Sequence, residues 1–311
     1  MVEIKTKENI LKMKKKLTVL FAMAVAMMGL VALSGCSKDT SNTDIITMKG
    51  DSIKVIDLYN EAKEFPGLPT TTLLQNATFS KIFEKAYGKN VSDKDVADKV
   101  ASYKTQYGAQ FDSMLQQQNM TADSFNAYVR LQLLEQYAID QNIQNTQMTD
   151  ANIKAAWNNF HPDVEAYVVM KTTQADATAV KTAATSDASK FEADNANAKQ
   201  TFDSTSTKIP ADVLTAAFKL KNGDVSDVIT VADQSTGQSS YYVVKMVKTS
   251  DKGNDMNKYK DTLKNFIKTQ KESDTSFAQG VIAKYLTDNN VTVKETAFGS
   301  IFAAFTSTSG Q

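Results

Sequence analysis

Cys36 and His161 are the only cysteine and the only histidine of this 311-residue chain, and they limit the chemistry that it can carry out. A single cysteine excludes disulfide bonds within the chain and clusters of thiolate metal ligands. A single histidine excludes a two-histidine metal site, and its place directly before Pro162 suits a surface or helix-end role better than a catalytic triad. Neither Gly-x-Gly-x-x-Gly nor a P-loop occurs. The sequence therefore predicts no metal and no cofactor.

Cys36 ends a stretch that is organised as a secretory signal. Met13 is followed by three lysines, residues 17–33 carry no charge, and small residues come directly before the cysteine. A transmembrane anchor is the alternative, since about 20 apolar residues can span a bilayer. The run is slightly short for that role, and its ending in small residues favours a signal peptide.

The motif Leu33-Ser34-Gly35-Cys36 resembles the lipobox of bacterial lipoproteins. The resemblance implies cleavage just before Cys36 and attachment of acyl chains such as palmitate to its thiol. We therefore expect residues 1–35 to be a signal peptide, with Met13 as the true start, and residues 36–44 to be a lipidated tether. The protein would then be anchored by lipid to the cell membrane and would work outside the cytoplasm.

Charge and length limit the classes of function that remain. Residues 1–35 contain six lysines and two glutamates, which leaves 29 basic and 33 acidic residues and a net charge of −4 beyond them. Arg130 is the only arginine. A nucleic-acid binder would need a basic face, so no nucleic acid is expected as a partner. The 276 residues from Cys36 onward are enough for two modest domains.

The hydrophobic pattern predicts helices first, then a mixed segment, then helices again. Apolar residues recur at helical spacing over most of residues 54–160. Residues 164–170, 228–231 and 241–247 are rich in β-branched and aromatic residues and predict strands, with helices between the first two. Helical spacing returns over residues 256–286. The sequence therefore predicts an α+β fold in which a helical part is interrupted by an α+β insert.

Several segments in order resemble the PrsA foldase family, lipoproteins that assist the folding of secreted proteins in Gram-positive bacteria. The resemblance begins at the lipobox and continues through residues 91–96, 106–111, 148–150, 162–166, 216–226 and 241–245. It implies a helical chaperone lobe formed by both ends of the chain, with a parvulin-type prolyl isomerase domain inserted. The expected boundaries of these parts are 45–161 for the N-terminal lobe, 162–250 for the parvulin-like domain, 251–290 for the C-terminal helices that rejoin the lobe, and 291–311 for a short strand and tail.

The resemblance also implies an isomerase site, from which this sequence departs. Val168 and Tyr242 stand where the family's two histidines would be. Ile209 and Val213 correspond to the apolar residues of the proline pocket and are smaller than the usual methionine and phenylalanine. Valine offers no hydrogen bond, and tyrosine offers only a hydroxyl of high pKa. We therefore assign no catalytic residue and expect weak or absent prolyl isomerase activity.

These observations favour a membrane-tethered foldase or chaperone whose helical lobe holds apolar segments of unfolded secreted proteins. Its other partner would be the membrane, through lipid on Cys36. Two alternatives stay open: an active peptidyl-prolyl cis–trans isomerase, and a solute-binding lipoprotein with two α/β lobes around a small-molecule pocket. Association into a homodimer is also left open.

Overall fold

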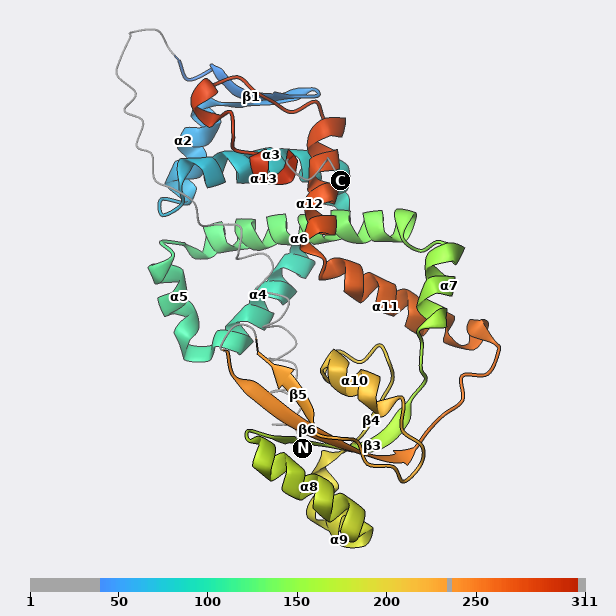
Figure 1. Ribbon diagram of the computed structural model, residues 1–311. Helices are drawn as coiled ribbons and strands as arrows, with labels where there is room; N and C mark the ends of the chain where they lie inside the picture. Colours follow the sequence, from blue (N-terminus) through green and yellow to red (C-terminus); the bar gives the residue numbers. More distant parts are fainter. Residues whose placement is uncertain (1–39, 234–236, 307–311) are drawn as a thin grey trace. The chain divides into compact units, whose positions relative to one another are not determined.

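The computed structural model describes residues 40–233 and 237–306 (Figure 1). The chain divides into two compact units, unit 1 (Met1–Gln147 and Lys268–Gln311) and unit 2 (Met148–Ile267). Cys36, the expected signal segment 1–35 and the first part of the expected tether lie outside the described residues. The fold is α+β, as the sequence predicts.

Unit 1 contains a small antiparallel sheet that joins the two ends of the described chain. Its strands are β1 (Asp44–Met48), β2 (Asp51–Lys54) and β7 (Thr292–Val293), in the order β2-β1-β7. The β1–β2 hairpin turns at Gly50, whose φ of +76° is readily adopted only by glycine. Because β7 pairs with β1, residues far apart in the sequence close one unit (Figure 1).

Helices make up the rest of unit 1, and several begin at cap residues. The Ser92 side chain accepts a hydrogen bond from the Asp95 N–H at the start of α4, and Thr121 does the same for Ser124 at the start of α6. Fully buried side chains that include Phe83, on α3, fill the core. The helices are α2 (Val55–Glu64), α3 (Thr70–Tyr87), α4 (Asp93–Tyr107), α5 (Phe111–Gln117), α6 (Ala122–Thr146), α12 (Thr275–Asp288) and α13 (Ala303–Thr306).

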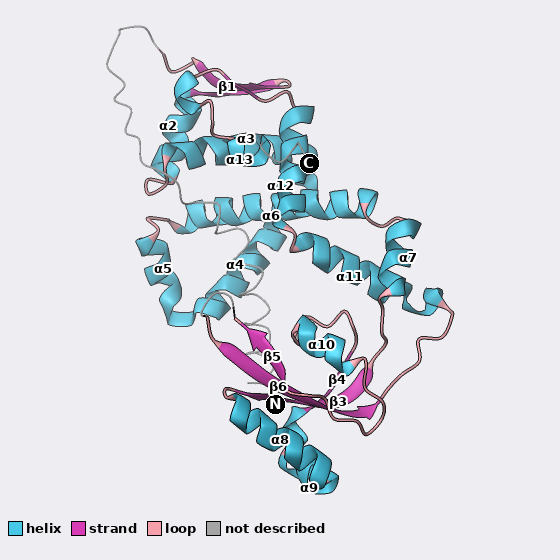
Figure 2. Cartoon of the chain, in the orientation of Figure 1, coloured by secondary structure: helices cyan, strands magenta, loops and turns pink. Residues whose placement is uncertain are grey.

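Unit 2 is built on a four-stranded antiparallel sheet with the strand order β4-β3-β6-β5 (Figure 2). The long central pair, β3 and β6, corresponds to the two strongest strand patterns of the sequence. Its elements are β3 (Val164–Lys171), α8 (Gln174–Ser186), α9 (Ala188–Asp194), β4 (Lys199–Phe202), α10 (Ala211–Ala217), β5 (Ile229–Ala232) and β6 (Ser239–Lys248).

Alternation along β3 gives this sheet two apolar faces, each covered by helix. Ala166 and its neighbours on one face share a buried cluster with Val213 of α10. Tyr167 and Val169 point to the other face and share a cluster with Phe191 of α9. A sheet that buries both faces is a rigid platform, so the side chains along its strands are held in fixed positions.

Two further helices belong to unit 2, namely α7 (Asp150–Asn158) and most of α11 (Lys260–Glu272). Ile153 and Leu263, on these helices, are buried in one cluster with Phe160, and Trp157 packs against it. Unit 2 therefore extends beyond residues 162–250 at both ends, because α7 and α11 share this core. The assignment of 162–250 to a parvulin-like domain stays a prediction.

Candidate functional site

Val168 and Tyr242, which stand where the resemblance expects histidines, lie on one face of the unit 2 sheet. Val168 is paired with Val244 across β3 and β6, and Tyr242 is paired with Met170. Directly opposite residues of antiparallel strands point to the same face. Val168 and Tyr242 therefore share the face that α10 covers, and both are partly exposed.

Ile209 and Val213, the two positions that correspond to the proline pocket, come from the start of α10. Pro210 precedes the helix, and its fixed φ suits a helix start. Val213 is completely buried and Ile209 nearly so, in the same cluster as Val244. Both side chains thus form part of the core between α10 and the sheet, and neither lines an open surface.

The chemistry of this face is apolar. Its four sequence-predicted positions contribute three aliphatic side chains and one hydroxyl, that of Tyr242. Beside them Met170 is 53% exposed, the only large apolar side chain among the described residues of unit 2 that is so exposed. Such a surface can hold apolar groups of a polypeptide, and the Tyr242 hydroxyl is the one polar side-chain group that these four positions contribute.

Met170 could not be recognised as exposed from the sequence. It follows the alternation of residues 164–170 and lies on the same face as the fully buried Ala166. It is exposed because it lies near the end of β3. Tertiary packing decides which end of a strand a helix covers, and the alternation of residues does not encode that packing.

His161 lies at the entrance to β3, where it stacks on an aromatic side chain. Its ring is 4.7 Å from that of Phe218 at an interplanar angle of 9°. Its backbone N–H donates to Ser204 Oγ at 2.8 Å. Burial, together with the Lys252 ammonium, lowers the pKa of His161. The imidazole is therefore neutral at pH 7, and these contacts fit the structural role expected for it.

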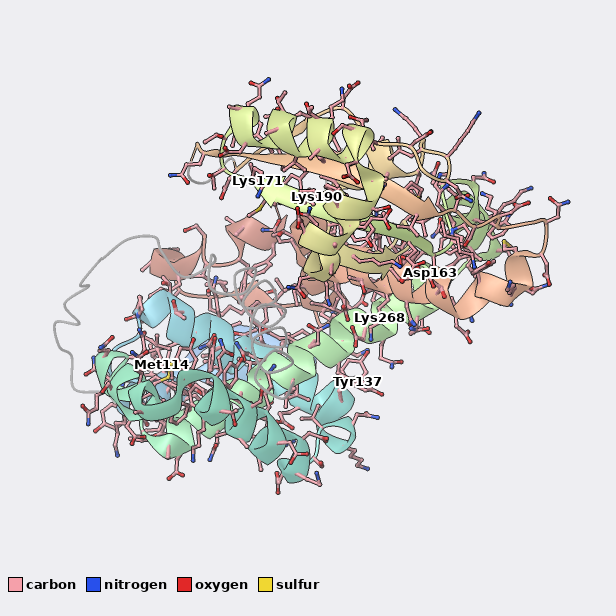
Figure 3. All side chains as sticks on the ribbon, turned by 90° about the horizontal axis from the view of Figure 1, so that it is seen from below. Met114, Tyr137, Asp163, Lys171, Lys190 and Lys268 are labelled. Carbon is pink, nitrogen blue, oxygen red and sulfur yellow. The ribbon has the colours of Figure 1, made fainter. Side chains whose placement is uncertain are left out.

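Among the described residues of unit 1, the large apolar side chains that are exposed lie on α2. Tyr59 is 59% exposed and Ile56 is 39% exposed. Tyr59 falls at helical spacing with Val55 and Leu58 but is exposed, because α2 packs on one side only and none of its residues is buried. Elsewhere, aromatic and methionine residues such as Met114 and Tyr137 pack against the unit 1 core (Figure 3).

A polar cluster lies between α4 and α6 of unit 1. The Tyr103 hydroxyl donates to Gln132 Oε1 at 3.1 Å, and Gln132 Nε2 donates to the Tyr128 hydroxyl at 2.7 Å. The Oε1 atom of Gln106 is buried without a hydrogen-bond partner among the described residues. Burial raises the pKa of Glu135, also on α6, to about 7. The cluster is polar but sits in low-dielectric surroundings.

Residues 40–233 and 237–306 offer neither a metal site nor a membrane-spanning helix. No group of three or more histidine, cysteine, aspartate or glutamate side chains there could hold a metal ion. No helix in that part of the chain is both long enough and apolar enough to cross a membrane. Lipidation of Cys36 lies outside it and stays a prediction.

Comparison with known proteins finds close relatives along nearly the whole chain. No family model matches. The foldase protein PrsA of Lactococcus lactis subsp. lactis is 60% identical over 299 residues, which cover 95% of this chain and 97% of the relative. The foldase protein PrsA of Streptococcus sanguinis is 39% identical over 309 residues, or 96% of this chain and 90% of the relative.

Solved structures give the same result for the fold. The crystal structure of a foldase protein (PrsA) from Lactococcus lactis matches with a TM-score of 0.71 at 61% identity, over 85% of this chain and 100% of that one. The crystal structure of foldase protein PrsA from Streptococcus pneumoniae matches with a TM-score of 0.68 at 36% identity, over 84% and 99% of the two chains.

Proposed function

This chain belongs to the PrsA foldase family, and from that membership we propose that it is a lipid-anchored chaperone with little or no prolyl isomerase activity. A foldase role comes with the family, and proteins that need help to fold are its substrates. The further elements of the proposal are its place at the outer face of the cell membrane, its action on secreted proteins after translocation, and its weak catalysis.

The proposal of weak catalysis rests on Val168 and Tyr242. An isomerase accelerates rotation about an X-Pro bond by binding the twisted amide more tightly than the planar one. Polar groups at the amide provide that preference. Here Val168 offers none, so the Tyr242 hydroxyl is the one polar group that these two positions provide to distinguish the two forms of the amide.

The sequence before the fold supports the proposed location. Leu33-Ser34-Gly35-Cys36 resembles a lipobox and follows an uncharged run, and residue 40 begins the described structure. A single acyl chain gives only reversible membrane binding, so stable anchoring would require more than one chain on the cysteine. Labelling cells with a radioactive fatty acid tests this: the wild-type chain should be labelled and a Cys36→Ala variant should not.

Two assays on a chain that begins at Ser37 test the chaperone and the enzyme separately. We expect it to suppress aggregation of a chemically unfolded protein at about equimolar concentration. We also expect the cis–trans exchange time of proline peptides to stay close to the uncatalysed value of roughly tens to hundreds of seconds. A parvulin that keeps both histidines is the positive control, and exchange as fast as in that control would make this chain an active isomerase.

The alternative of a solute-binding lipoprotein fits the fold poorly. That class requires two α/β lobes around a ligand pocket. Unit 1 is instead helical with one small antiparallel sheet. A thermal-shift screen with small solutes should accordingly give no stabilisation, and a clear shift with one solute would reopen this alternative.

A further inference from the structure

The outer edge of β5 has no neighbouring strand in the described part of the chain. In the order β4-β3-β6-β5, β5 pairs only with β6, so its other side is an edge of the sheet. The N–H and C=O groups on such an edge can pair with another extended chain. Proteins usually protect these edges with lysine, proline or a bulge, or by covering them.

β5 lacks these protections, whereas the opposite edge has one. β5 reads Ile-Thr-Val-Ala, four uncharged residues of which three are β-branched. At the other edge of the sheet, β4 carries Lys199, which forms an ion pair with Glu165 at 2.9 Å. In unit 1 the edge strand β2 carries Asp51 and Lys54. The fourth edge strand of the described sheets, β7, has only two residues, so β5 is the edge strand that resembles a template for strand addition.

The register of the β5–β6 hairpin determines which backbone groups of β5 face outward. The Asp233 N–H donates to the Gln238 C=O at 2.7 Å, so this opposed pair is hydrogen-bonded. Pairs alternate along an antiparallel ladder, which makes Val231 and Ile229 the next residues bonded to β6. Thr230 and Ala232 therefore direct their N–H and C=O groups away from β6, and the described residues provide no other partner for these groups.

The face beside this edge is apolar. Ile229 and Val231 are partly buried and belong to the same cluster as Tyr242, the cross-strand partner of Ile229. Tyr242 lies opposite the exposed Met170 on its other side. A strand added to β5 would place every second side chain on this face, because side chains alternate along a strand.

We propose that the outer edge of β5 binds an extended segment of an unfolded client protein as an added antiparallel strand. Affinity comes from main-chain hydrogen bonds to Thr230 and Ala232, so recognition requires no proline and tolerates many sequences. Alternate apolar side chains of the client pack on the side of Ile229 and Val231. This proposal rests on the proposed chaperone function and assigns it a second mode of client binding.

A client segment fits this edge better than a second copy of the chain. Asp227 and Asp233 flank β5, so pairing of two β5 strands would gather four carboxylates around a short ladder. Asp227 forms an ion pair with Lys181 at 2.6 Å, which lowers the pKa of Asp227 and offsets part of its charge. Basic residues at the ends of a client segment would instead be attracted, and this sets the design of the probe.

The probe is a short proline-free peptide of alternating valine and threonine with lysine at both ends. N-methyl groups on every second residue block one of its edges and prevent it from aggregating. The control peptide carries the same number of N-methyl groups divided between both edges. We expect the probe to bind the chain from Ser37 onward, the control to bind at least about fivefold more weakly, and amide hydrogen exchange of Thr230 and Ala232 to slow.

Three variants locate the binding. Thr230→Pro removes an N–H that points away from β6, a position at which an edge strand tolerates proline. Thr230→Val keeps that N–H and is the matched control. Ala232→Lys keeps the backbone and adds the protection that natural edges use. We expect about fivefold or greater loss of probe binding with Thr230→Pro and Ala232→Lys, and none with Thr230→Val.

The outcomes separate this proposal from the chaperone function. Equal probe binding by all three variants, or no binding by a chain that still suppresses aggregation, overturns the strand-addition proposal and leaves the function intact. If the wild-type chain does not suppress aggregation, the proposed chaperone function is itself wrong. If the Thr230→Pro variant does not fold, probe binding by the Ala232→Lys variant tests the proposal. A dimer in sedimentation that Ala232→Lys converts to monomer assigns the edge to a second copy and also overturns the proposal.

Discussion

Under the proposed function, Tyr242 and Val168 would let one face of a sheet bind peptides without catalysing isomerisation. The two residues sit on adjacent central strands, within the apolar cluster beneath α10. An apolar surface binds a peptide by removing apolar area from water, at about 25 cal/mol per Å². That gain is the same for a planar and a twisted proline amide, so it adds to binding and not to rate.

Glu135 should make the stability of unit 1 depend on pH. Its folded-state pKa is raised from 4.5 to about 7 by burial, so the folded state holds a proton that the unfolded state loses near pH 4.5. Folding stability therefore falls as pH rises from about 4.5 to 7 and levels off above. We expect Glu135→Gln to raise the free energy of unfolding at pH 8 by about 1–2 kcal/mol and to leave it unchanged at pH 4.

Urea unfolding at the two pH values checks this expectation. Tyr128→Phe is the control, because it alters the same cluster without removing the carboxyl and should not change the pH dependence in this range. A second carboxyl, that of Glu61 on α2, also has its pKa raised to about 7 by burial and by neighbouring carboxylates. Some pH dependence should therefore persist in Glu135→Gln, but an undiminished slope would contradict the prediction.

Local signals in the sequence predict the elements of this fold well. The long apolar alternation of 164–170 and 241–247 predicts β3 and β6, which pair along their length. The apolar residues around the turn at 49–51 are consistent with a short strand or a hairpin, and the structure has the β1–β2 hairpin there. These segments succeed because their pattern, their turn residues and their burial all favour the same structure.

Where tertiary contacts decide, the sequence predicts less. β4 was not expected, because only Phe202 of its four residues is buried and the strand forms by pairing with β3. Tyr59 fits a helical stripe yet is exposed. For the candidate site, the positions of Val168 and Tyr242 could be taken from the family pattern. The exposure of Met170 follows from which end of β3 a helix covers, and the open edge of β5 follows from strand order. Short-range patterns contain neither.

The first turn of α4 offers a test at the scale of one element. Ser92 accepts from the Asp95 N–H, and the Asp95 side chain accepts in turn from the Ser92 N–H at 2.8 Å. Together they satisfy two N–H groups that the helix leaves unpaired. The Ser92 hydroxyl and the Ser92 N–H both donate to the Asp95 carboxylate, which lowers the pKa of Asp95. Ser92→Ala should lower the free energy of unfolding by about 1 kcal/mol, measured by urea titration.

Ser92→Asp is the matched control, because aspartate is as good an N-cap as serine. It should retain most of the stability, reduced only by repulsion from Asp95. Equal losses in both variants would mean that the hydroxyl matters for a reason other than capping, and no loss in Ser92→Ala would mean that α4 is held by its packing alone.

At the scale of the whole molecule, the order of the chain differs from its order in space. β1 and β7 bring residues 44–48 and 292–293 into one sheet, and unit 2 lies between them in the sequence. Unit 1 can therefore be completed only after unit 2 has been synthesised. Each unit nevertheless has its own buried cluster, centred on residues such as Leu134 in unit 1 and Val213 in unit 2.

Separate cores predict separable unfolding, and the single tryptophan provides the means to observe it. Trp157 is on α7 and packs in unit 2, so its fluorescence reports that unit. Val213→Ala should destabilise unit 2 by about 2 kcal/mol and lower the midpoint seen by fluorescence. Leu134→Ala should destabilise unit 1 by about 2–5 kcal/mol. Because unit 1 contains most of the helical residues, the midpoint seen by far-ultraviolet circular dichroism should fall. The fluorescence midpoint should not change. If either variant moves both midpoints together, the two units unfold as one cooperative body and the cores are not independent.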